Sequence, residues 1–217
     1  MANLQDVLLS GTRAGQPAAT AVAEGTLYFV TDEEVTEQSD GAAWAPYSAT
    51  VLLDRVGQLD IVNTAAETSI YSYSVVGGTL GATNTLHLLM DGDQLNNAGA
   101  GNDTVTLKIK YGATTMYSDT ALYASNATRI SWRMDIRLGN TTGTSAQYVS
   151  VQFLTSTRGG ATTGNGDFNA NGTQYAILSG TAAEDSTATK TFDVTIQHSL
   201  TDATVSWRRQ YASLVKE

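Results

Sequence analysis

The sequence has no cysteine, and Pro17 and Pro46 are its only prolines. Without cysteine, disulfides, thiolate metal sites and cysteine nucleophiles are all excluded. We therefore expect the fold to be stabilised by core packing, by hydrogen bonds within sheets and by contacts between subunits.

Long apolar runs are also missing. No run approaches the roughly 18 residues that a bilayer-spanning helix needs. Residues 1–10 lack the basic segment and apolar stretch of an export signal. The expectation is a soluble protein made in a cytoplasm, with no membrane insertion.

Charge is sparse and mostly negative. Charged residues make up 15% of the chain, and 12 basic against 21 acidic residues give a net charge of -9. Such a field repels phosphate backbones, so we do not expect nucleic acid as a partner. Arg129, Arg133 and Arg137 recur at every fourth position of a predicted strand, where a solvated or intersubunit ladder is expected.

The dominant period of the sequence beyond about residue 60 is two, which is typical of half-buried strands. In 128–138, five apolar residues from Ile130 to Leu138 alternate with polar ones. Further strands are predicted at 59–63, 70–76, 85–90, 103–111, 114–118, 147–155, 174–178, 191–199 and 203–211.

This pattern predicts an all-β chain with little helix, in which a small N-terminal β-hairpin module precedes an antiparallel β-sandwich of the jelly-roll type. We expect the module at 1–48, a linker at 49–58 that includes a short helix, and the sandwich at 59–217. A second, weaker helix is expected over 208–217. Turns are expected at glycines such as Gly78, Gly92 and Gly139, which tolerate positive φ.

Catalytic chemistry has few residues to draw on. The two histidines, His87 and His198, lie in strand patterns without a nucleophile elbow or zinc-ligand spacing. We therefore expect no enzyme activity, no catalytic residues and no cofactor.

Calcium is the one ion with plausible ligands in the sequence, because Asp91, Asp93 and Asp167 lie among asparagines and glycines. These aspartates belong to two segments, 91–97 and 165–171, and neither segment has the bidentate glutamate of an EF-hand loop. Tight turns require the same residue types, so a calcium site and ordinary turns both remain open interpretations of these segments.

Two groups of aromatic residues could contact a partner. Phe168 is the one large apolar residue of a long polar segment at 157–173, and such segments often carry function. Tyr71, Tyr73 and Tyr117 would supply amphipathic contact area to a receptor or to another subunit. The alternatives are that Phe168 packs back on a sheet edge and that the tyrosines cap the sheets of a monomer.

Three segments near the N-terminus occur in a distinctive order: GTRAGQP at 11–17, GTLYFVTD at 25–32 and SDGAAW at 39–44. Together they resemble a small β-module found near the N-terminus of bacteriophage tail-fibre and head-fibre proteins. Where relatives commonly place two alanines after Arg-Pro, this chain has Ala14 to Ala19 as AGQPAA. The residues that carry the resemblance are Arg13, Pro17, Leu27, Tyr28, Phe29, Asp32, Asp40, Gly41 and Trp44.

The resemblance implies a virion protein. In such proteins the module lies near the end that attaches to the particle. The strand-rich remainder of this chain looks like the trimeric jelly-roll heads that terminate fibres and spikes, which are similar to tumour-necrosis-factor and C1q domains. The implied partners are other copies of the chain in a homotrimer, capsid or tail proteins, and a host-surface glycan.

Three functions are therefore weighed. The first is an exposed, non-enzymatic fibre or spike on the virion surface that meets the host. The second is a capsid head fibre or decoration protein with no receptor role. The third is a carbohydrate-active enzyme on a β-sandwich, which would need carboxylates such as Asp91 and Asp93.

Overall fold

A computed structural model describes residues 8–47, 51–81, 84–99, 102–123, 125–155 and 175–217. The chain forms two compact units, Met1–Val51 and Leu52–Glu217. Both are built from strands, and the helical residues of the described ranges are two short 3-10 turns, so the all-β prediction is confirmed.

The first unit is a four-stranded sheet with the order β1-β2-β3-β4, in which β1 runs parallel to β2 and the other pairs are antiparallel. It therefore contains more than the expected hairpin. Its elements are β1 (Leu8–Gly11), η2 (Arg13–Gly15), η3 (Ala19–Ala21), β2 (Leu27–Val30), β3 (Val35–Ser39) and β4 (Trp44–Pro46).

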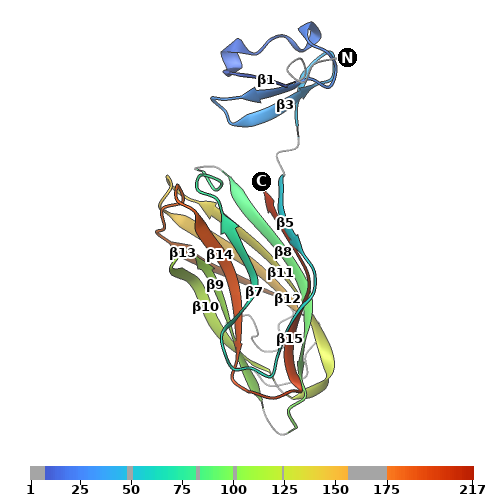
Figure 1. The fold of residues 1–217 in the computed structure, drawn as a ribbon, viewed down its shortest axis with the longest axis vertical. Helices are drawn as coiled ribbons and strands as arrows, with labels where there is room; N and C mark the ends of the chain where they lie inside the picture. Colours follow the sequence, from blue (N-terminus) through green and yellow to red (C-terminus); the bar gives the residue numbers. More distant parts are fainter. Residues whose placement is uncertain (1–7, 48–50, 82–83, 100–101, 124, 156–174) are drawn as a thin grey trace. The chain divides into compact units, whose positions relative to one another are not determined.

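The second unit is a sandwich of two sheets (Figure 1). The four-stranded sheet has the order β10-β9-β14-β7, with β7 (Thr68–Val75), β9 (Asp103–Tyr111), β10 (Thr114–Tyr123) and β14 (Lys190–His198). The seven-stranded sheet has the order β13-β12-β11-β8-β15-β5, and β6 also pairs with β15. Its strands are β5 (Val51–Val56), β6 (Leu59–Val62), β8 (Thr85–Asn96), β11 (Asn126–Asn140), β12 (Gln147–Thr155), β13 (Tyr175–Ala182) and β15 (Val205–Lys216).

The strand order is that of a jelly roll. We count β5 and β6 as the first strand and set aside the β12–β13 hairpin, which extends the larger sheet. The larger sheet then holds the first, eighth, third and sixth strands, and the smaller sheet holds the second, seventh, fourth and fifth. This interleaving of early and late strands is what two nested Greek keys produce.

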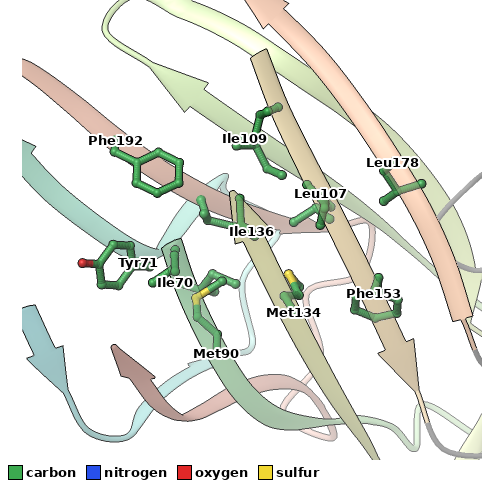
Figure 2. Close-up of a cluster of buried hydrophobic side chains, with 14 of the residues drawn as sticks. Ile70, Tyr71, Met90, Leu107, Ile109, Met134, Ile136, Phe153, Leu178 and Phe192 are labelled. Atoms are coloured by element: carbon green, nitrogen blue, oxygen red, sulfur yellow. The ribbon is translucent and has the colours of Figure 1, made fainter. Parts of the chain in front are cut away.

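The core lies between the two sheets. Figure 2 shows Met134 and Ile136 from the larger sheet close to Leu107 and Ile109 from the smaller one, all of them fully buried. Burying one such side chain stabilises a fold by about 1.5–3 kcal/mol. Because successive side chains of a strand point to opposite faces, the alternating sequence positions of β9, β11, β12 and β14 supply this core.

The strand predictions with the clearest alternation are confirmed. Every apolar residue assigned to the buried face of 128–138 is buried, and those of 103–111, 147–155 and 191–199 are buried as well. The weaker predictions at 59–63, 70–76, 85–90, 114–118 and 174–178 all fall within or largely overlap strands.

The two expected helices are wrong. Residues 51–56 form β5 and 205–216 form β15, and these two strands pair with each other. Helices this short gain little from local propensity, so pairing within the sheet decides the conformation. The linker expected at 49–58 is therefore largely part of the sandwich.

A β-bulge changes which side chains of β15 face the core. The pairing of β15 with β8 shifts register between Arg209 and Tyr211, which leaves Gln210 as the extra residue. After it Ala212 and Leu214 are fully buried, whereas Tyr211, expected on the buried face, is only partly buried. A bulge of one residue has this effect because the side-chain period of a strand is two.

The turns expected at Gly92 and Gly139 are also wrong, because both glycines lie in strands and neither has a positive φ. At Gly92 a Cβ atom would overlap the Trp132 ring and the Arg208 carbonyl. Glycine is required there for the close approach of an indole ring. At Gly78 the expected turn is present, with φ of 83°.

Candidate functional site

The sheet of the first unit has one face covered by its own loop. Tyr28 and Ser39 on that face are buried, and the loop that contains η2 and η3 is hydrogen bonded to it. The Tyr28 hydroxyl donates to the Thr12 carbonyl at 3.2 Å and the Trp44 indole N–H donates to the Pro17 carbonyl at 2.7 Å. The two rings pack with centroids 5.7 Å apart.

Arg13 connects this loop to the sheet. Its guanidinium lies 2.6 Å from Glu33 and 2.7 Å from Glu37, and it also donates to the Gln16 side chain. The hydrogen bonds to Glu33 and Glu37 raise the pKa of Arg13, and the bonds from Arg13 and Gln16 lower the pKa of Glu37. Arg13 thus acts as a brace within the module, with its donors directed to the module's own carboxylates.

The opposite face, which we call the open face, is not covered by any element of the described residues 8–47. The register places four large side chains on this face: Leu8, Leu27, Phe29 and Tyr47. Leu8 pairs with Leu27. Phe29 pairs with Thr36, whose carbonyl accepts the Tyr47 N–H. Leu8 is 51% exposed, Phe29 42% and Tyr47 47%. Three large apolar side chains on one side of so small a sheet are typical of a contact surface.

A shallow hollow of about 190 Å³ adjoins the open face. Gln38 and Ala45 belong to both, and Glu24, Gly25, Ser39 and Asp40 complete its lining. Within residues 8–47, no hydrogen bond or ion pair engages the side chains of Glu24 and Gln38. The hollow therefore offers polar groups that the module itself does not use.

The sequence-predicted attachment residues divide into three groups. Arg13, Pro17, Tyr28 and Trp44 make the internal contacts described above. Leu27 and Phe29 lie on the open face.

Asp32, Asp40 and Gly41 shape turns. Asp32 accepts the Arg13 backbone N–H at 2.8 Å, and Asp40 accepts those of Ala42 and Ala43, which lowers the pKa of its carboxyl group. Gly41 has φ of 88°. The motif residues thus mostly build the module, and two of them belong to its open face.

The tyrosines proposed to contact a partner lie in or against the core. Tyr71 is 1% exposed and donates to Asp54 at 3.1 Å, and burial raises its pKa. Tyr73 and Tyr117 are partly buried and pack on the core cluster. A ring as buried as that of Tyr71 offers no contact surface, so that hypothesis is wrong for Tyr71. Phe168 lies outside the described residues.

The aspartates considered for calcium lie within β8 instead of a turn. Asp91 pairs with Arg133 at 2.6 Å and Asp93 pairs with Arg129, so these two arginines of the β11 ladder are matched by carboxylates on the neighbouring strand. Arg137 instead lies near Asp135 and Glu217. In the described ranges no three histidine, aspartate or glutamate side chains are grouped so that they could hold a metal ion. Asp167 lies outside these ranges.

The two histidines occupy different environments. His198 lies 2.5 Å from Asp103, and each side chain is 1% exposed. Asp103 also accepts the Ser199 hydroxyl at 3.0 Å and two backbone N–H groups, so this buried cluster fixes the turn after β14. His87 lies on the outer face of the larger sheet, with its ring nitrogens 2.9 Å from Asp135 and 3.0 Å from Glu217.

Sequence reasoning missed Leu8, Tyr47, Glu24 and Gln38 as parts of the module's surface. Residues 35–39 read VTEQS, in which only Val35 is apolar, so this strand gave no alternation from which one covered and one open face could be predicted. The parallel pairing of β1 with β2, which adds Leu8 to the open face, has no local sequence signal.

Comparison with known proteins gives one structural neighbour to report. No protein-family model matches the chain, and no curated protein matches it. The neighbour is the solved structure of the CBM2 module of the evolved Dit of Lactobacillus casei BL23 phage J-1. It is 12% identical, covers 67% of each chain and gives a TM-score of 0.31. A similarity of this size carries no argument about function.

The described part of the chain contains no helix with the length and apolar character to span a bilayer.

Proposed function

We propose that this chain is a non-enzymatic structural protein of a phage virion, an exposed fibre or spike that attaches to the particle through its N-terminal module. One observation carries the proposal: residues 8–47, which resemble a fibre attachment module, form a separate compact unit whose sheet has one covered and one open apolar face. A unit of this kind is suited to docking, because its internal contacts are complete without the open face.

The absence of enzyme activity is part of this proposal. It is supported by the burial of the His198–Asp103 pair and by the ion pairs that hold Asp91 and Asp93. The proposal expects that the original chain does not turn over a cell-wall polysaccharide. Turnover by the original chain that is lost in the Asp91→Asn variant would overturn it.

A homotrimer is proposed as the oligomeric state. Tyr148, Leu154 and Ile177 are exposed on the outer face of the β12–β13 hairpin, with Ile177 at 63%. Because monomeric proteins rarely leave such residues grouped in water, a second copy is the proposed occupant. Light scattering of the purified chain should give three times its 22.9 kDa mass, and Ile177→Lys should lower that mass.

A host-surface glycan is the ligand proposed for the sandwich. Binding of the full chain on a glycan array tests this role. If the chain is present in particles and binds no glycan, the head-fibre or decoration alternative replaces the receptor role.

The particle itself tests the proposal as a whole. Particles released by lysis from cells that carry this gene should contain the chain after density-gradient purification, as measured by mass spectrometry. If it is absent from such particles, the proposal is wrong.

A further inference from the structure

We infer that the open face of the N-terminal module binds a basic segment of another virion protein, one that inserts an apolar side chain over Phe29 and places a lysine or arginine in the adjoining hollow. This inference rests on the proposed function and names the partner's chemistry.

The charge of the module is the first argument. Residues 8–47 contain six carboxylates, Glu24, Asp32, Glu33, Glu34, Glu37 and Asp40, and one cation, Arg13, for a net charge of -5. Arg13 is engaged by Glu33 and Glu37. The module's described residues therefore present no free cation, and complementary charge has to come from a partner.

The position of two carboxylates is the second argument. Glu24 and Asp40 both line the hollow, together with the amide of Gln38. Asp40 uses Oδ1 for the backbone N–H groups of Ala42 and Ala43, and within residues 8–47 no hydrogen bond or ion pair engages its Oδ2 atom. The hollow can thus offer Glu24, the second oxygen of Asp40 and Gln38 to a cationic side chain.

The continuity between hollow and open face is the third argument. Gln38 belongs to both and pairs with Leu27, which is followed two residues later on the same face by Phe29. Alternate residues of a strand are about 6.6–6.8 Å apart. A partner segment with an apolar and a basic residue at similar spacing can therefore reach both features at once.

The same charges disfavour a second copy as the occupant. Two open faces that met hollow to hollow would bring Glu24 and Asp40 of both copies together, and like charges brought together at an interface weaken binding. Another copy, the chain's own sandwich and a neutral glycan are outcomes that the experiment separates.

The test uses charge reversal at two places in the full chain. Glu24→Lys changes the hollow, and the matched control Glu34→Lys makes the same change of net charge in the turn between β2 and β3, at the other end of that hairpin. Four residues of strand separate the two ends by about 13 Å, which exceeds the screening length of about 8 Å at physiological salt. Near-ultraviolet circular dichroism, to which Tyr28 and Trp44 contribute together with the aromatic residues of the second unit, checks that both variants keep the tertiary packing of the original chain.

Particles assembled with Glu24→Lys should contain at least tenfold less of the chain than particles assembled with Glu34→Lys. Equal incorporation of the two variants would overturn the inference. A wild-type chain that is itself absent from particles would instead overturn the proposed function.

Photocrosslinking identifies the occupant directly. A benzoylphenylalanine in place of Phe29 should form an adduct, in purified particles, with a peptide of a different protein that contains more lysine and arginine than aspartate and glutamate. Adducts with this chain's own peptides, with another copy or with an acidic peptide would contradict the inference, as would no adduct at all.

Discussion

Gly92 is the residue on which the packing of the two large indoles depends. Trp132 and Trp207 are stacked with centroids 5.2 Å apart, and Gly92 pairs with Trp132 on one side and Arg209 on the other. Any side chain at position 92 has to displace both the Trp132 ring and the backbone of β15 at the Arg208 carbonyl. Trp207 stacks on Trp132 and is fully buried, so these displacements would extend into the core.

Substitution of Gly92 by alanine should therefore lower the free energy of unfolding by about 1–3 kcal/mol, the usual cost of overpacking a core. Gly139→Ala is the matched control, because a Cβ there meets only ordinary contacts at 3.5 and 3.7 Å and the residue has no positive φ. Urea denaturation of both variants measures the difference. Equal destabilisation would show that the indole contact has no special role.

Glu67 should make the free energy of unfolding depend on pH below about pH 4.5. Its carboxylate binds Lys108 at 2.5 Å and also Lys110, and these hydrogen bonds lower its pKa from 4.5 to about 2. Since the folded-state pKa is the lower one, the stabilisation is complete above about pH 4.5 and is lost as the pH falls toward about 2. Glu67→Gln should be less stable than the original chain at pH 7, and the gap should close over that interval in denaturation curves. A gap that stays constant from pH 7 to pH 2 would contradict this assignment.

At the scale of the elements, a buried polar network ties the β11–β12 hairpin to the segment between β13 and β14. Gln147 is 1% exposed, and its amide N–H₂ donates to the Asn140 side chain and the Glu184 carbonyl at 2.7 and 2.9 Å. Its oxygen accepts the Glu184 N–H at 2.8 Å. All of these groups lose their partner when the amide is removed.

Gln147→Ala should cost about 1–3 kcal/mol of unfolding free energy, because it leaves buried polar groups without a partner. Ser118→Ala, at an exposed position of β10, provides the comparison and should change stability by no more than about 0.5 kcal/mol. Hydrogen exchange at Glu184 is the local readout. If its protection is unchanged in Gln147→Ala, the network does not hold this segment.

The sequence predicted correctly which side chains are buried where the alternation within one strand determines it. Met134 and Ile136 could be assigned to the core because a slip of one residue would place the whole apolar face of β11 in water. It failed where a second strand decides. The bulge at Gln210 depends on the register with β8, and β5 is a strand because it pairs with β15.

The same limit applies to the candidate site. The motif residues Leu27 and Phe29 were identified from their order in the sequence, but their place beside Leu8 depends on a parallel pairing across nearly twenty residues. The hollow brings Glu24 next to Asp40 through the ends of two strands. Neither arrangement follows from local spacing.

At the scale of the whole molecule, the net negative charge and the large hydrophobic core are concentrated in different units. The module at 8–47 holds a net charge of -5 of the total of -9, in less than a quarter of the residues. The jelly roll holds the large core and a face of matched ion pairs. The proposed function assigns attachment to the charged module and exposure on the particle to the jelly roll.

Antibody labelling of intact particles tests this division most directly, with one antibody raised against residues 8–47 and another against the jelly roll. The account predicts that the jelly-roll antibody labels intact particles, whereas the module antibody binds only after the particles are dissociated. Labelling of intact particles by the module antibody alone, or the absence of the chain from dissociated particles, would contradict it.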